Sequence, residues 1–245
     1  MKIALASSHV ITKNVAYNTT SALHAMEQCG GQADLVVFGE SMLQGFESLS
    51  WDYETDCGMA LSLDDPRLVQ IRNAAKQNHL AVSFGFIEKE ADALFSSQLF
   101  VGAEGEIIDH FHRVSEGWKA YWQTDAHYRE GEKFRAFSYG GKTFSVGLCG
   151  DLWTEGRPEE MKSLHPDVVL WPVWCDFDAR EWNETVKYEY ARQAALCGDL
   201  VLYVNPFCTD AFVSDAATGG AACFKKGRIT SLCPAGKSDI LWVSV

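Results

Sequence analysis

Residues 142–153 of this chain read Lys-Thr-Phe-Ser-Val-Gly-Leu-Cys-Gly-Asp-Leu-Trp. The apolar part predicts a buried strand, and the glycine and acid that follow Cys149 indicate that the chain leaves the sheet there. A thiol at the C-terminal edge of a buried strand is well placed to act as a nucleophile. The alternative is a core cysteine, which is the more common fate of a single cysteine.

A carboxylate at the end of a second apolar segment favours the nucleophile. Residues 35–40 read Leu-Val-Val-Phe-Gly-Glu, so Glu40 follows a predicted buried strand. A carboxylate there is poorly placed for simple solvation and well placed to accept the proton of a thiol. The two segments together predict a cysteine with an adjacent base.

The composition indicates a folded protein with a large core. The chain has 245 residues, of which 47% are hydrophobic and 22% charged, so disorder is not expected. The formal net charge of -12 argues against a nucleic-acid partner and against docking to anionic membranes. Its simplest interpretation is solubility.

The cysteines and the N-terminal segment favour a cytoplasmic protein. No apolar run reaches membrane-spanning length, and residues 1–6 predict a first strand and not a signal peptide. The eight cysteines show neither a CxxC pair nor zinc-finger spacing, so we expect reduced thiols and no zinc. No cofactor is expected.

Strand and helix patterns alternate along the chain. Helices are expected at residues 18–29, 65–78, 157–164 and 182–197. Strands are expected at 2–7, 35–38, 81–87, 93–101, 105–112, 134–137, 143–149, 168–172 and 200–205, with more in 219–245. Without a linker or repeat, this order predicts one α/β domain over residues 1–245, in which helices flank facing sheets.

Six segments, in this order along nearly the whole chain, resemble motifs of the nitrilase, or carbon–nitrogen hydrolase, superfamily. They are residues 35–46, 105–113, 128–134, 146–151, 191–205 and 219–229. One motif would be weak evidence, whereas six in the right order are strong evidence for the fold. The resemblance implies a four-layer αββα sandwich and a homodimer or larger homo-oligomer.

The resemblance also implies hydrolysis or transfer at a carbon–nitrogen bond. A glutamate takes the thiol proton, the thiolate attacks a carbonyl or nitrile carbon, and a lysine supports the charged tetrahedral intermediate. These roles agree with the chemistry, because a thiol with a pKa of about 8.5 is mostly protonated at neutral pH and benefits from a base. The backbone N–H of Gly150, next to the nucleophile, is a natural oxyanion donor.

The main departure from the family pattern is Arg113, which stands at the position of the lysine. An arginine can stabilise an oxyanion, but it cannot shuttle a proton. Lys119, six residues later, could reach back and supply the missing ammonium, or it could be a solvated surface lysine. We expect Arg113 to lie beside Glu40 and Cys149, and we keep Lys119 as a second candidate.

Two further departures concern the surroundings of the site. Many family members carry a second glutamate, whereas this chain has Thr124 at the equivalent position, with Asp125 and Glu130 as imperfect substitutes. The family's Pro-Glu pair follows the cysteine closely, but Pro158-Glu159 comes later here. Residues 154–157 are therefore expected to be a small insertion at the mouth of the site.

Tryptophans are dense around the predicted catalytic loops. Trp153 and Trp174 follow strands on the catalytic edge and are the best candidates to line a pocket for a flat or apolar acyl group. For any single tryptophan, ordinary packing is the more common role.

Three histidines lie near Arg113, and their spacing raises the question of a metal. We expect His110 and His112 to point to alternate faces of a strand or to lie in a loop, and His127 is more distant in sequence. No metal site is therefore predicted.

The leading prediction is a cysteine-dependent amidase that acts on a small-molecule amide or carbamoyl compound through an acyl-enzyme at Cys149. The first alternative is a catalytically silent binding or scaffolding homologue, motivated by Arg113 and the missing second glutamate. An unrelated hydrolase with a Cys–His pair would need His165, which precedes a proline in an expected loop.

Overall fold

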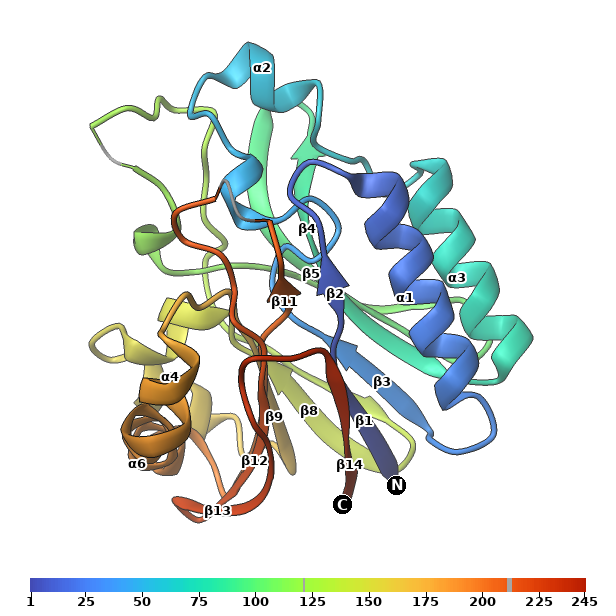
Figure 1. The fold of residues 1–245 in the computed structure, drawn as a ribbon, viewed down its shortest axis with the longest axis vertical. Helices are drawn as coiled ribbons and strands as arrows, with labels where there is room; N and C mark the ends of the chain where they lie inside the picture. Colours follow the sequence, from blue (N-terminus) through green and yellow to red (C-terminus); the bar gives the residue numbers. More distant parts are fainter. Residues whose placement is uncertain (121, 211–212) are drawn as a thin grey trace.

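A computed structural model describes residues 1–120, 122–210 and 213–245. Within these residues, two six-stranded sheets lie face to face, and helices cover their outer surfaces (Figure 1). The strand orders are β14-β1-β3-β4-β5-β6 and β13-β12-β10-β9-β8-β7. The predicted four-layer αββα sandwich is therefore confirmed.

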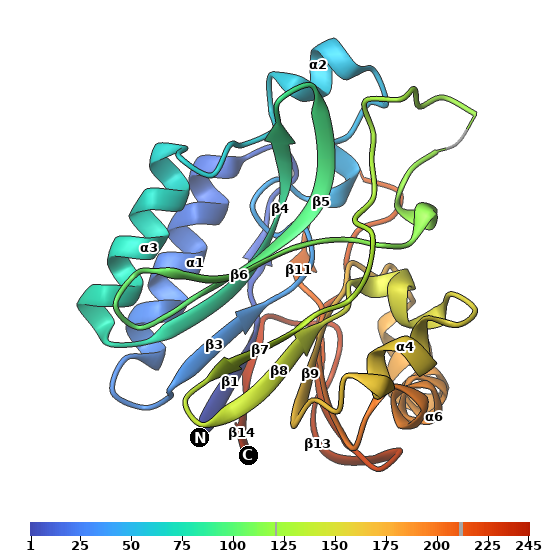
Figure 2. The same ribbon diagram turned by 180° about the vertical axis from the view of Figure 1, so that it is seen from behind.

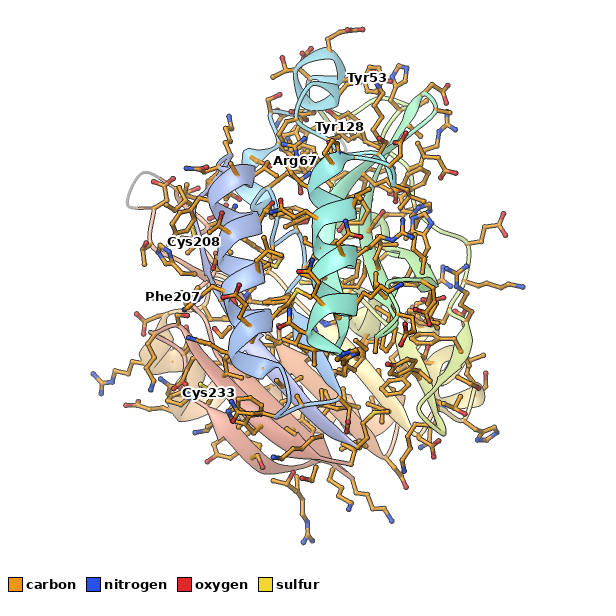
Figure 3. The ribbon with its side chains drawn as sticks, turned by 90° about the vertical axis from the view of Figure 1, so that its right-hand side faces the viewer. Tyr53, Arg67, Tyr128, Phe207, Cys208 and Cys233 are labelled. Carbon is orange, nitrogen blue, oxygen red and sulfur yellow. The ribbon has the colours of Figure 1, made fainter. Side chains whose placement is uncertain are left out.

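The first sheet contains β1 (Lys2–Ser7), β3 (Leu35–Phe38), β4 (Ala81–Glu90), β5 (Ala93–Val101), β6 (Ile107–His112) and β14 (Asp239–Ser244). Strands β1, β3 and β4 are parallel, and their apolar runs are buried on both faces. Helices α1 (Val15–Cys29) and α3 (Pro66–Asn78) lie side by side over the outer face (Figure 3). Asp65 caps the N-terminus of α3. Pro66 follows in the first helical turn, where the missing N–H of proline has no cost because it would have no partner within the helix.

The second sheet contains β7 (Ala136–Tyr139), β8 (Lys142–Val146), β9 (Val168–Pro172), β10 (Leu200–Val204), β12 (Ala221–Lys225) and β13 (Arg228–Cys233). Helices α4 (Arg157–Ser163) and α6 (Lys187–Cys197) pack on its outer side (Figure 2). The single helix expected at 182–197 is instead α5 (Ala179–Glu181), a π-helical turn η4 (Trp182–Val186) and α6.

The alternation of side chains along β1 contributes to two different clusters of the core. In β1, Ile3 and Leu5 belong to the cluster between the sheets, whereas Ala4 and Ala6 belong to the cluster under α1 and α3. Successive side chains of a strand point to opposite faces, so one strand supplies both clusters. The small alanines face the layer that the helices must approach closely.

Short elements surround one end of the two sheets. They are β2 (His9–Val10), paired in parallel with β11 (Phe207–Cys208), and the short helices η1 (Phe46–Ser48), α2 (Tyr53–Cys57), η2 (Glu116–Trp118) and η3 (Cys149–Trp153). The carboxyl ends of β3 and β9 meet here, because the backbone N–H of Glu40 donates to the carbonyl of Val173 at 3.2 Å. Neither α1 nor any other described helix has the length and apolar character that crossing a bilayer requires.

Candidate active site

Cys149 lies at the start of η3 and not inside a strand. Strand β8 ends at Val146, so the strand predicted for residues 143–149 is too long at its C-terminal end. The φ angle of Cys149 is 39°, in the left-handed region that residues with a side chain rarely adopt. Such strain persists where the surrounding structure enforces it, as at the strand-to-helix turn that exposes a nucleophile.

Two tryptophans hold the Cys149 turn. The indole N–H of Trp171 donates to the Cys149 carbonyl at 2.9 Å, and the Cys149 thiol donates to the Trp174 carbonyl at 3.8 Å. Trp171 is fully buried in β9, so it is a rigid support. The sequence placed Trp171 only among the tryptophans near the catalytic loops, because its contact with Cys149 crosses between neighbouring strands.

Asp151 joins the cysteine turn to the segment after β6. Its Oδ1 accepts the backbone N–H groups of Val114 at 3.1 Å and Ser115 at 2.7 Å, and its Oδ2 accepts that of Leu148 at 2.9 Å. Burial raises the pKa of Asp151 to about 6, although Arg113 and these donors act to lower it. Asp151 therefore holds the backbone that follows Arg113 against the turn that carries Cys149.

Glu40 and Arg113 form a buried ion pair. Arg113 Nη1 and the Ser96 hydroxyl donate to the same Glu40 oxygen, Oε1, at 2.9 and 2.8 Å. The other oxygen, Oε2, is also buried, and no residue that the structure describes donates to it. One oxygen thus fixes the carboxylate, while the second retains the capacity to accept a proton.

The guanidinium of Arg113 lies against the cysteine turn. A Cβ atom on Gly150 would come within 2.6 Å of Arg113 Nη2, so only glycine fits there. Arg113 Nε donates to the Ser115 hydroxyl at 2.9 Å. Burial alone would lower the pKa of Arg113, but the charges of Glu40, Cys149 and Asp151 outweigh it and raise that pKa above its usual value. The site therefore contains a permanent cation.

Cys175 has the largest effect on the pKa of the nucleophile. Its thiol donates a hydrogen bond to the Cys149 sulfur, which lowers the pKa of Cys149 with help from Arg113 and against the effects of burial and Glu40. The same contact raises the pKa of Cys175 well above its usual value. The Asn205 side chain holds the Cys175 backbone through bonds of 3.0 and 2.8 Å. The only sequence signal for Cys175 was its position next to Trp174, after a strand of the catalytic edge.

This contact predicts the effect of changing Cys175. In Cys175→Ala the pKa of Cys149 should rise, so alkylation by iodoacetamide at neutral pH should slow and its pH midpoint should move upward. Cys175→Ser keeps a hydroxyl donor and should restore much of the rate. Cys29→Ala, which removes a buried thiol from the last residue of α1, is the control. An unchanged pH profile in Cys175→Ala would show that Cys175 does not tune the nucleophile.

Lys119 has a carboxylate partner of its own. Its Nζ lies 2.8 Å from Glu130 Oε1 and donates to the Tyr128 carbonyl at 2.9 Å. The indole of Trp118 also donates to Glu130, at 3.1 Å. Glu130, one of the possible substitutes for the second glutamate, therefore binds Lys119, whereas Arg113 binds Glu40.

The other residues considered for the second glutamate lie in local contacts. Thr124 donates to the Ala120 carbonyl at 3.1 Å. Asp125 accepts from the backbone of His127 at 2.9 Å and pairs with its ring at 2.8 Å. More than half of the Asp125 side chain is exposed, at 58%.

The two tryptophans predicted for a pocket occupy different environments. Trp153 is 43% exposed in η3, and its ring lies 5.9 Å from that of Trp171. Trp174 is 8% exposed, and its indole donates to the Asp215 carbonyl at 2.9 Å. Trp153 therefore presents an aromatic surface to solvent beside the nucleophile, whereas Trp174 meets Cys149 through its backbone carbonyl.

Gly39, directly before Glu40, has no room for a side chain. A Cβ atom at Gly39 would lie 2.4 Å from Cδ of Pro206. The ring of Pro206 thus occupies the space that a side chain at position 39 would need. The close approach brings the segment after β10 against the strand end that carries Glu40.

The prediction that His110 and His112 point to alternate faces is wrong. They are two residues apart on β6, and residues i and i+2 of a strand share a face. Both rings contact the carboxylate of Glu88 on β4, a residue that sequence reasoning missed. His127 lies elsewhere, stacked on Tyr53.

Comparison with known proteins supports the predicted fold. A model of the carbon-nitrogen hydrolase family matches residues 4–171. An (R)-stereoselective amidase from Pseudomonas sp. is 25% identical over 170 residues, which cover 69% of this chain and 59% of the amidase. A cyanide hydratase from Stereum hirsutum is 24% identical over 238 residues, which cover 87% of this chain and 57% of the hydratase. The chain thus spans less than two thirds of either relative.

Solved structures show the same architecture. A carbon–nitrogen hydrolase superfamily protein from Xanthomonas campestris, with an arsenic adduct in its active site, has a TM-score of 0.79 and 18% identity over 99% of this chain and 89% of its own. A mutant amidase from Nesterenkonia sp. AN1, whose active-site cysteine has added acrylamide, has a TM-score of 0.77 and 15% identity over 100% and 93%. At these identities the similarity shows the fold.

Proposed function

This chain belongs to the carbon-nitrogen hydrolase family, and on that premise we propose that it hydrolyses a small amide or carbamoyl compound through an acyl-enzyme at Cys149. The observation that carries the proposal is the buried pair of Glu40 and Arg113 beside a half-buried cysteine in a strained turn. The relatives that resemble this chain include proteins described as an amidase, arylacetonitrilases and cyanide hydratases. The amide class is preferred because it is the broader activity implied by the family resemblance.

In the first step, the thiol of Cys149 transfers its proton to Glu40 Oε2, the buried oxygen to which no described residue donates. The sulfur then bonds to the carbonyl carbon, and the π-electron pair moves onto the carbonyl oxygen. The positive charge of Arg113 and the backbone N–H of Gly150 stabilise that oxyanion. Charge stabilisation of this kind typically contributes about 3–4 kcal/mol per donor.

In the second step, the carbon–nitrogen bond breaks, and the leaving nitrogen takes the proton that Glu40 received. Arg113 cannot supply that proton, because a guanidinium between two carboxylates does not deprotonate. In this mechanism Glu40 therefore carries the proton from the thiol to the leaving nitrogen. Water then attacks the thioester with Glu40 as base, and the released thiolate recovers its proton.

The test is a panel of small amides, ureas and carbamoyl compounds, with ammonia release and the mass of the trapped acyl-enzyme as readouts. We expect release of ammonia from at least one class and a mass increase confined to the peptide that contains Cys149. The alternative, a silent binding homologue, is motivated by Arg113. It would be supported if the panel gave no turnover and iodoacetamide alkylated Cys149 no faster than the other seven cysteines.

The choice between Arg113 and Lys119 as the functional cation is a separate prediction. Arg113→Ala should lower turnover roughly 100- to 1000-fold, the usual loss for one oxyanion donor. Arg113→Lys should recover part of it, because charge is kept while the two-pronged contact is lost. Lys119→Ala should cost much less, because Lys119 is paired with Glu130. If Lys119→Ala alone abolished turnover, Lys119 and not Arg113 would serve as the catalytic cation.

We also propose a domain organisation, an oligomeric state and a cellular location for the protein. We expect residues 1–245 to act as one catalytic domain, to form a homodimer or larger homo-oligomer, and to work in the cytoplasm with reduced thiols. Sedimentation of the purified protein at several concentrations measures the oligomer directly.

A further inference from the structure

A compact cluster of metal-binding side chains lies outside the candidate active site. His110 Nε2 and His112 Nε2 lie 2.6 and 3.0 Å from the same oxygen, Oε2 of Glu88, and 3.0 Å from each other. The three atoms come from two strands, β4 and β6, on either side of β5. The cluster therefore forms a triangle with sides of about the same length.

Hydrogen bonds alone cannot satisfy this triangle while Glu88 is ionised. If both histidines carry a proton on Nε2, both can donate to the carboxylate, but two N–H groups then face each other across 3.0 Å. If only one carries it, the lone pair of the other faces the carboxylate. In every protonation state of the two rings, at least one side of the triangle is repulsive.

Glu88 is fixed beneath the two imidazoles. Its side chain is 1% exposed, and the Ser97 hydroxyl donates to the same oxygen at 2.6 Å. A buried carboxylate facing two imidazoles thus offers a negative donor to a cation.

The dimensions fit a transition-metal ion. Bonds of about 2.0–2.1 Å at right angles place neighbouring ligand atoms about 2.9 Å apart, and tetrahedral angles place them about 3.3 Å apart. The observed sides of 2.6–3.0 Å are close to the first value, so a cation just above the triangle would need only small side-chain shifts. One such ion makes all three sides attractive at once.

The site is open on the side of the histidines. A cleft of about 310 Å³ is lined by Glu90, His110, His112, Glu132 and other residues of the same surface. His110 and His112 are 22% and 19% exposed, while Glu88 lies beneath them. Glu90 Oε2 is 3.9 Å from His112 Nε2, within reach as a fourth ligand. Water can occupy the remaining positions.

We propose that Glu88, His110 and His112 bind one divalent transition-metal ion, with Zn²⁺ as the preferred occupant. Two imidazoles and one carboxylate suit zinc and its neighbours in the transition series, whereas Ca²⁺ and Mg²⁺ prefer sites made of oxygen ligands alone. The ion would join β4 to β6 on the face opposite to Phe111, which packs between the sheets. This proposal is independent of the amidase proposal.

The test uses the full chain without an added histidine tag, stripped with a chelator and desalted. Titration with ZnCl₂ in a calorimeter should give one site per chain, and CoCl₂ should give visible ligand-field bands without thiolate-to-metal absorption. His110→Gln, His112→Gln and Glu88→Gln should each weaken binding by at least roughly 10- to 100-fold, the loss seen even for residues that only support a ligand. His127→Gln, which changes a histidine paired with Asp125, should bind as the unchanged protein does.

The outcomes are distinguishable even if one variant folds poorly. Far-UV circular dichroism identifies such a variant, and the unchanged protein should still gain thermal stability with ZnCl₂ and lose it with chelator. Absence of a tight site in the unchanged protein would overturn the proposal. So would a cobalt spectrum dominated by thiolate absorption, or well-folded His110→Gln and His112→Gln variants that bind as tightly as the His127→Gln control.

Discussion

Cys149→Ala should lower turnover of any amide substrate by roughly 10⁴-fold or more, because loss of a covalent nucleophile removes the function of the whole catalytic unit. The variant should fold normally, since alanine keeps the Cβ atom and the main-chain bond from the Trp171 indole to residue 149. Steady-state rates and a thermal melt of the same samples provide the measurement.

The matched control is Cys223→Ala, which removes a buried thiol from β12, a strand of the second sheet remote from the turn at residue 149 in sequence. It should keep its turnover. Wild-type turnover in Cys149→Ala would show that the acyl-enzyme mechanism is wrong, even if the chain proved to be a hydrolase.

Glu40→Gln should lower amide turnover by about 100-fold or more, the usual contribution of a general base. The structure adds a sharper expectation. The negative charge of Glu40 raises the pKa of Cys149, so its removal should lower that pKa and leave more thiolate at neutral pH. Alkylation by iodoacetamide, which needs no proton for a leaving amine, should then be as fast as in the unchanged protein or faster.

These two readouts separate a proton carrier from a residue that only supports the fold. A misfolded Glu40→Gln site would lose both amide turnover and fast alkylation. Amide turnover within about tenfold of the unchanged protein would mean that another group carries the proton. Ser96→Ala is a useful companion, because it removes a donor to Glu40 Oε1 while leaving the carboxylate and Arg113 in place.

Local patterns in the sequence determined the fold class and the position of the candidate site. The ordered motifs predicted the αββα sandwich, and most strand and helix ranges agree with the structure within a few residues. Glu40 and Cys149 were named because each lies at the end of an apolar segment, and Arg113 because it stands at the lysine position of the family pattern. These three segments end strands of two different sheets, so their meeting depends on how the sheets pack against each other.

Tertiary structure alone decided which side chains touch. Ser96 and Arg113 reach Glu40 across sequence separations of 56 and 73 residues, and nothing in the local pattern of residue 96 indicates that contact. The sequence also did not predict the positive φ angle of Cys149, because the strand was expected to continue through this residue. Cys175 could be placed near the edge, but not its hydrogen bond to the nucleophile.

The cluster of Glu88, His110 and His112 shows the physical reason most clearly. The period of a strand determines that His110 and His112 share a face, and that much was available from the sequence once β6 was recognised. Their meeting with Glu88 depends on the order and register of β4, β5 and β6, which pair Ser97 with both Phe86 and His112. Register is set by packing of whole sheets, so local sequence determines which way a side chain points and the assembled sheet determines what it meets.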